Sequence, residues 1–194
     1  MNWDSSGIVL GQNSKGILRC SPDGGPQQQL ATVKEGEQAH GPQMLPGGAT
    51  LLFTIAKGAD GATRWDKADV VVQTLTSGSR KTVVTGGSGA RYLRTGHLLY
   101  ARGGIVLAVP FDPVRQVVLG EPVQVVEGVR RANNSRTATV HLTTSDAGTL
   151  FYIPGPAGTT IMANVLALAD RPGVRGTIGA PGSFVNCQQD TQQL

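Results

Sequence analysis

Short runs of apolar residues, each preceded by a tight turn that contains glycine, recur along the chain. They follow Gly7, Gly48, Gly96 and Gly148, which lie 41, 48 and 52 residues apart. A polar, extended stretch precedes each turn, and two further short apolar segments follow each run. Glycines and prolines recur between the apolar runs, so the pattern disfavours helices. Each unit is therefore predicted to be four short strands joined by tight turns.

A repeat of roughly 40–50 residues that consists of strands and turns is typical of a β-propeller. We expect an all-β fold of about four blades over residues 1–182, each blade a four-stranded antiparallel sheet. The approximate blades are residues 1–35, 36–87, 88–131 and 132–182. Residues 183–194 are expected to form a C-terminal strand or tail, which either closes the ring or continues into a longer propeller of which this chain is a part. Residues 161–169 are predicted to be a strand rather than a short helix.

The composition agrees with this fold and disfavours several classes of function. The 27 glycines and 11 prolines suit many tight turns. The formal net charge is +4, but only 5% of the residues are aromatic, so no nucleic-acid-binding face is expected. No stretch approaches 18 consecutive apolar residues, and membrane insertion is not expected. The start of the chain does not resemble a signal peptide, so we expect a soluble, cytoplasmic protein. If the chain is a piece of a larger protein, the periplasm or the cell exterior is the alternative.

Several motifs together resemble those of a known propeller family. They are the segments 21–26, 88–92, 96–101, 109–113, 120–123 and 145–152. Through these segments, roughly residues 3–180 resemble the TolB-type, WD40-like propeller in the C-terminal sensor region of bacterial serine/threonine kinases. The resemblance implies a sensor or interaction module without established catalytic residues. It does not imply phosphoryl transfer, because the sequence contains no kinase domain.

Candidate ligand-binding residues lie on the polar stretches that precede the turns. In a propeller these stretches are expected to be the innermost strands and to line the central channel, a concave place where a ligand can bind. His40 and His141 lie on two of them and are the candidate catalytic bases, although a histidine there is more often a hydrogen-bonded wall residue. Arg91 and Tyr92 are further candidates for ligand binding at the channel mouth, as is Asn186 if the C-terminal strand joins the ring.

A possible calcium site is the polar insertion at residues 57–67, which is expected to be a long hairpin loop at one rim. Asp60, Asp66 and Asp69 cluster around this insertion, and their carboxylate oxygens are ligands that Ca²⁺ prefers. Their spacing does not match an EF-hand, so a solvated loop is the alternative. No other cofactor is expected.

The sequence leaves two functions open. The first is a non-catalytic propeller scaffold that binds a protein partner or a small ligand at the channel mouth. The alternative is a Ca²⁺-dependent lactone or ester hydrolase, in which a metal in the channel polarises the carbonyl and a histidine or carboxylate activates water. Unpaired strand edges of an incomplete ring also predict a homodimer.

Overall fold

The computed structural model describes residues 2–4, 7–58, 61–132, 137, 139–145, 148–155, 164–170 and 173–182, with residues 4, 61, 62, 164–170 and 173–182 described as backbone alone. The chain divides into two compact units, Met1–Thr159 and Thr160–Leu194. In its described residues, the first unit contains three antiparallel sheets and a hairpin, and the second unit contains one hairpin.

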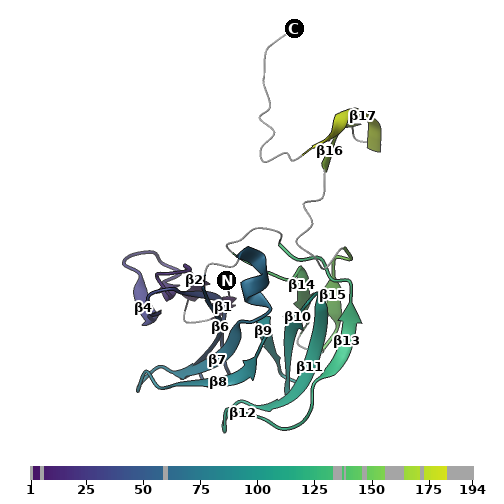
Figure 1. The fold of residues 1–194 in the computed structure, drawn as a ribbon. Helices are drawn as coiled ribbons and strands as arrows, with labels where there is room; N and C mark the ends of the chain where they lie inside the picture. The colour runs from purple at the N-terminus through teal and green to yellow at the C-terminus, as the bar shows by residue number, and fades with distance from the viewer. Residues whose placement is uncertain are drawn as a thin grey trace. The chain divides into compact units, whose positions relative to one another are not determined.

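The three sheets of the first unit follow one another in chain order (Figure 1). The first sheet contains β1 (Asn2–Asp4), β2 (Gly7–Gly11), β3 (Ile17–Cys20) and β4 (Gln28–Ala31). The second sheet contains β5 (Glu37–Met44), β6 (Thr50–Lys57), β7 (Asp69–Thr74) and β8 (Arg80–Thr85). The third sheet contains β9 (Ser88–Leu93), β10 (His97–Arg102), β11 (Ile105–Asp112), β12 (Val117–Val118) and β13 (Val123–Glu127).

Within each sheet the strands pair antiparallel and in chain order, so the first strand forms one edge. In the third sheet, β12 and β13 both pair with β11, at opposite ends of that strand. This arrangement confirms the expected all-β fold with four-stranded antiparallel sheets.

Two hairpins follow the third sheet along the chain. The first unit ends with β14 (Leu142–Thr144) and β15 (Leu150–Tyr152). The second unit contains β16 (Asn164–Asp170) and β17 (Gly173–Gly182). The strand expected at residues 161–169 is thus present in its described part. The assignment of both hairpins to one blade, and the blade boundaries in general, remain predictions, and the tail at 183–194 lies outside the described residues.

Apolar clusters lie between neighbouring sheets, and the alternation of side chains along each strand decides which cluster a residue joins. On β7, Val70 and Val72 pack in a cluster with the third sheet, whereas Val71 packs in a cluster with the first sheet. On β10, Leu98 joins the cluster shared with the second sheet, and Leu99 joins a third cluster that includes Val140. Strands buried on both faces are expected where a sheet lies between two others.

The strength of these contacts follows from their composition. The cluster between the second and third sheets contains Leu52, Tyr100 and Phe111, each at most 3% exposed. Full burial of one such apolar side chain contributes about 1.5–3 kcal/mol. Several of them on each interface therefore hold neighbouring sheets together without long loops or helices between them.

The insertion at residues 57–67 differs from the expected solvated loop. It contains η1 (Gly61–Trp65), a single 3-10 turn, and the side chain of Trp65 is 1% exposed. Trp65 packs with Ala56 and Ala68. The polar residues of this segment predict a solvated loop, whereas its tryptophan has a large apolar ring that favours burial.

Candidate functional site

The inner strands β5 and β9 have the same local distortion. The pairing of β5 with β6 changes register between His40 and Gln43, and Gly41 between them has a φ of +63°. The corresponding glycine of β9, Gly89, has a φ of +65°, and the pairing of this strand with β10 is also irregular. A β-bulge with a left-handed residue favours glycine, because a side chain there is strained. The two bulges place His40 and Ser88 on the wall of one cavity.

A wide cavity of about 1000 Å³ lies at the ends of the inner strands. It is lined by residues of β1, β5, β9 and β14 and by the turn after β5. The lining residues are Asn2, Trp3, Gln43, Met44, Leu45, Pro46, Gly47, Gly48, Arg91, Tyr92, Leu93, Arg94, Leu142, Thr143, Thr144 and Ser145. None of them is acidic, and the two arginines are the charged groups among them. The first strand of each sheet thus faces a common space, as expected for a channel.

A side-chain amide links β5 to β9 at this cavity. Gln43 Nε2 donates to the carbonyl oxygen of Tyr92 at 3.1 Å, and the Tyr92 backbone N–H donates to Gln43 Oε1 at 2.8 Å. The amide therefore satisfies both backbone groups of Tyr92, as a neighbouring strand would. The Tyr92 ring packs edge-on against Phe111, with 6.1 Å between the ring centroids.

A second, small cavity of about 80 Å³ lies at the bulges. It is lined by His40, Gly41, Thr54, Trp65, Ser88, Gly89, Arg91, Thr139, Val140 and Leu142. Thr54 stands opposite His40 in the pairing of β5 with β6. Arg91 and Leu142 line both cavities.

Arg91 is the cationic group shared by the two cavities. Its Nη1 donates to the carbonyl oxygens of Gly41 at 3.0 Å and of Ala90 at 2.9 Å. Burial lowers the pKa of Arg91 from its ordinary value, yet an arginine remains protonated in proteins. Among the described residues it forms no ion pair, so its charge is opposed by carbonyl dipoles alone.

His40 is neutral at physiological pH. Burial is the main reason that its pKa falls from 6.5 to about 4, and the positive charge of Arg91 acts in the same direction. Its ring contacts Trp65 edge-on, with the ring centroids 5.8 Å apart. A neutral imidazole has one donor and one acceptor nitrogen, so His40 adds no charge to the small cavity.

Three of the ligand-binding candidates from the sequence come together in the structure. Arg91 lines both cavities, Tyr92 lines the wide cavity and His40 lines the small one. His141 lines neither cavity, although its neighbours in the chain line the small one; its backbone N–H donates to the carbonyl of Arg130 at 2.8 Å. Asn186 lies outside the described residues.

The candidate calcium ligands are engaged with separate cations. Asp66 Oδ1 accepts from Arg131 Nη1 at 2.7 Å, and Asp69 Oδ2 accepts from Lys57 Nζ at 3.3 Å. Asp60 lies outside the described residues. In the part of the chain that the structure describes, no group of three or more histidine, cysteine, aspartate or glutamate side chains could hold a metal ion. The described walls of the channel also lack carboxylates, so these residues do not fit Ca²⁺.

Sequence reasoning missed three residues of the small cavity: Thr54, Trp65 and Ser88. Thr54 belongs to an otherwise apolar run on β6, and Trp65 belongs to an otherwise polar insertion. Ser88 is given no role by the sequence pattern, and it is the first residue of β9. A polar residue inside an apolar strand, and an aromatic residue inside a polar loop, are the signals that could have identified two of them.

Comparisons with known proteins give one informative match. No protein-family model and no curated protein sequence matches the chain. A crystal structure of regucalcin from Agrobacterium tumefaciens, described as a calcium-binding protein, is similar to it with a TM-score of 0.54 and 10% sequence identity. The match covers 91% of this chain and 56% of the regucalcin chain.

The fold is a β-propeller. This follows from the likeness to regucalcin together with the successive four-stranded antiparallel sheets. At 10% identity the likeness concerns the fold alone. Calcium binding by regucalcin is therefore no evidence that this propeller binds calcium. Among the described residues, no helix has the length and apolarity needed to cross a membrane. The cellular compartment remains a prediction.

Proposed function

We propose that this propeller is a non-catalytic binding module whose wide cavity takes a small ligand with acidic groups. The observation that supports the proposal most is the charge of the cavity wall. Arg91 and Tyr92 lie on β9, and Arg94 directly follows this strand; all three line the wall, and none of the described lining residues is acidic. The volume of about 1000 Å³ is at the upper end of the usual range for small-molecule sites.

A sensor role agrees with this proposal and with the resemblance of the sequence to TolB-type propellers of bacterial kinases. A ligand bound between the first strands of the sheets contacts several sheets at once. Its binding can therefore change the arrangement of these sheets within the first unit. Protein partners at the rim and a homodimer through unpaired strand edges remain further predictions. Hydrolysis of lactones is not part of the proposal, because the described channel residues do not include a carboxylate, the charged ligand of Ca²⁺ sites.

Thermal unfolding tests the proposal with a panel of small mono- and dicarboxylic acids and sugar phosphates. A ligand present at 100 times its Kd stabilises the folded state by about 2.7 kcal/mol, which raises the Tm of a protein of this size by several degrees. For a member that binds, Arg94→Gln should raise the Kd at least fivefold, because it removes one of the two charges from the wall. Arg94 is exposed, so the variant should fold.

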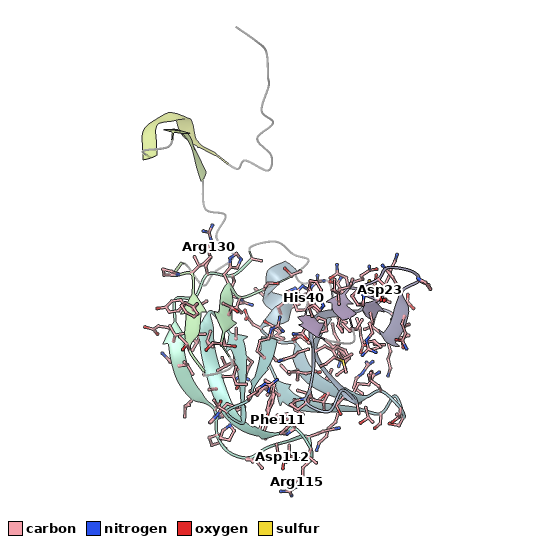
Figure 2. The ribbon with its side chains drawn as sticks, turned by 180° about the vertical axis from the view of Figure 1, so that it is seen from behind. Asp23, His40, Phe111, Asp112, Arg115 and Arg130 are labelled. Atoms are coloured by element: carbon pink, nitrogen blue, oxygen red, sulfur yellow. The ribbon has the colours of Figure 1, made fainter. Side chains whose placement is uncertain are left out.

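Arg115→Gln is the matched control. Arg115 is an exposed arginine on the loop after β11, and Figure 2 shows it at the opposite end of the first unit from His40. Its loss changes the net charge by the same amount without touching either cavity. The proposal is wrong if no member of the panel raises the Tm, or if Arg94→Gln and Arg115→Gln weaken binding equally.

A further inference from the structure

Three residues that line the small cavity each carry a buried polar atom without a hydrogen-bond partner. The atoms are Thr54 Oγ1, Trp65 Nε1 and Ser88 Oγ, and their residues are 1%, 1% and 2% exposed. None of them bonds to any other described residue. Buried polar groups in folded proteins are nearly always paired, and unpaired ones are costly. Their concentration on one cavity wall therefore indicates that something polar occupies the cavity.

The chemistry of the wall indicates what that occupant is. The indole N–H of Trp65 is a donor and cannot accept, whereas the hydroxyls of Thr54 and Ser88 can donate. Arg91 adds a positive charge and further donors, and none of the described lining residues is acidic. A wall of donors around one guanidinium favours acceptors with negative charge and disfavours a metal cation.

The volume limits the size of the occupant. A water molecule takes about 30 Å³ of liquid, so a cavity of about 80 Å³ holds two or three waters or a group of four to five heavy atoms. A carboxylate group and a phosphate group both meet this limit. A whole metabolite does not, unless the rest of it extends into the wide cavity, whose wall shares Arg91 and Leu142.

We propose that the small cavity is an oxyanion site, in which Arg91, Ser88, Thr54 and Trp65 bind a carboxylate or phosphate group. The group is either a free oxyanion or the terminal group of a larger acidic ligand in the wide cavity. In the second case the inference rests on the proposed function. The neutral ring of His40 also lines the cavity and can donate or accept one hydrogen bond. The positive charge of the proposed site therefore comes from Arg91.

Isothermal titration with matched probes tests this proposal on the full chain in a buffer free of oxyanions. The probes are inorganic phosphate and acetate, with acetamide as a neutral molecule of the same shape as acetate. Phosphate or acetate should bind with a stoichiometry of one, and acetamide should not bind. Ser88→Ala and Thr54→Val should each raise the Kd at least tenfold, whereas Arg115→Gln should leave it within twofold. Both substitutions remove an unpaired polar atom, so the variants should fold at least as stably as the original chain.

The outcomes separate the two sources of the oxyanion. Binding of free phosphate or acetate that Ser88→Ala weakens supports a free oxyanion. Binding that is confined to a larger acid from the panel, and that Ser88→Ala weakens, supports a terminal group. If neither substitution weakens the binding of any anion, or if no anion binds, the cavity holds water alone and the inference is overturned. A ligand that depends on Arg94 and not on Ser88 or Thr54 leaves the proposed function intact while it removes the oxyanion site.

Discussion

His40 shows how the surroundings of one residue set its protonation. Its ring lies against Trp65 and near Arg91, on the wall of the small cavity. Protonation there would place a positive charge in a partly desolvated position beside a guanidinium, which is why the pKa of His40 falls to about 4. In the unfolded chain this penalty is absent. The unfolded state therefore takes up a proton first as the pH falls.

The stability of the protein should reflect this difference between pH 6.5 and pH 4. The folded-state pKa is below the unfolded value, so His40 destabilises the fold as the pH falls through this range. One pKa unit corresponds to about 1.4 kcal/mol, and partial exposure of the ring screens part of the effect, so we expect a loss of about 1–3 kcal/mol. Urea unfolding of the original chain and of His40→Gln at several pH values measures it. Between pH 6.5 and pH 4, the free energy of unfolding of the variant should fall by about 1–3 kcal/mol less than that of the original chain. If the two proteins show the same dependence on pH, the lowered pKa of His40 is wrong.

At the scale of strands and turns, the sequence predicts what depends on local signals. The turn at Gly48 precedes β6 and the turn at Gly96 precedes β10, because a tight turn and a following apolar run are both encoded within a few residues. The bulges at Gly41 and Gly89 were not predicted. A bulge depends on the register of the neighbouring strand, which a single sequence does not contain.

The residues of the candidate site differ in the same way: some can be predicted from their own segment of the sequence, and others depend on the packing of distant segments. Arg91 was predicted because it lies on a polar stretch of the expected channel wall. Thr54 and Trp65 were missed, because their position at the cavity depends on how β6 and η1 pack against β5 and β9. That packing brings together residues from separate segments of the chain, and hydrophobic periodicity within one strand does not report it.

The contact between β5 and β9 should depend on Gln43. Its amide is the hydrogen-bond partner of both backbone groups of Tyr92, and Gln43→Ala leaves them without it. Each unsatisfied buried group costs about 1–3 kcal/mol. Partial access to water reduces this cost, so we expect the two groups together to lower the free energy of unfolding by about 1–3 kcal/mol. Urea unfolding measures the loss, and hydrogen exchange should show faster exchange of the Tyr92 amide.

A second glutamine provides the control for this change. Gln124 lies exposed on β13, and its amide Nε2 donates to Glu127 Oε2 at 3.4 Å. Gln124→Ala should change the stability by less than about 0.5 kcal/mol. Equal losses in the two variants would mean that the amide of Gln43 does not link the strands.

For the first unit as a whole, stability comes from interfaces between neighbouring sheets. One apolar cluster joins the first and second sheets and includes Phe53. Another joins the second and third sheets and includes Phe111, which Figure 2 shows within the first unit. The second sheet contributes opposite faces of the same strands to the two clusters. In such repeat architectures stability approximates a sum of units and nearest-neighbour interfaces.

Two matched substitutions should therefore weaken different parts of the first unit. Phe53 and Phe111 are 0% and 2% exposed, and replacement of either by alanine should cost about 3–5 kcal/mol in global unfolding. Their effects on local opening should differ, because each removes a contact from one interface. Hydrogen exchange measured by mass spectrometry should show that Phe53→Ala increases exchange in β2 and β3 while β10 and β11 keep their protection. Phe111→Ala should reverse this order. If both variants increase exchange uniformly across the three sheets, the first unit unfolds as one cooperative block and the description by separate interfaces is wrong.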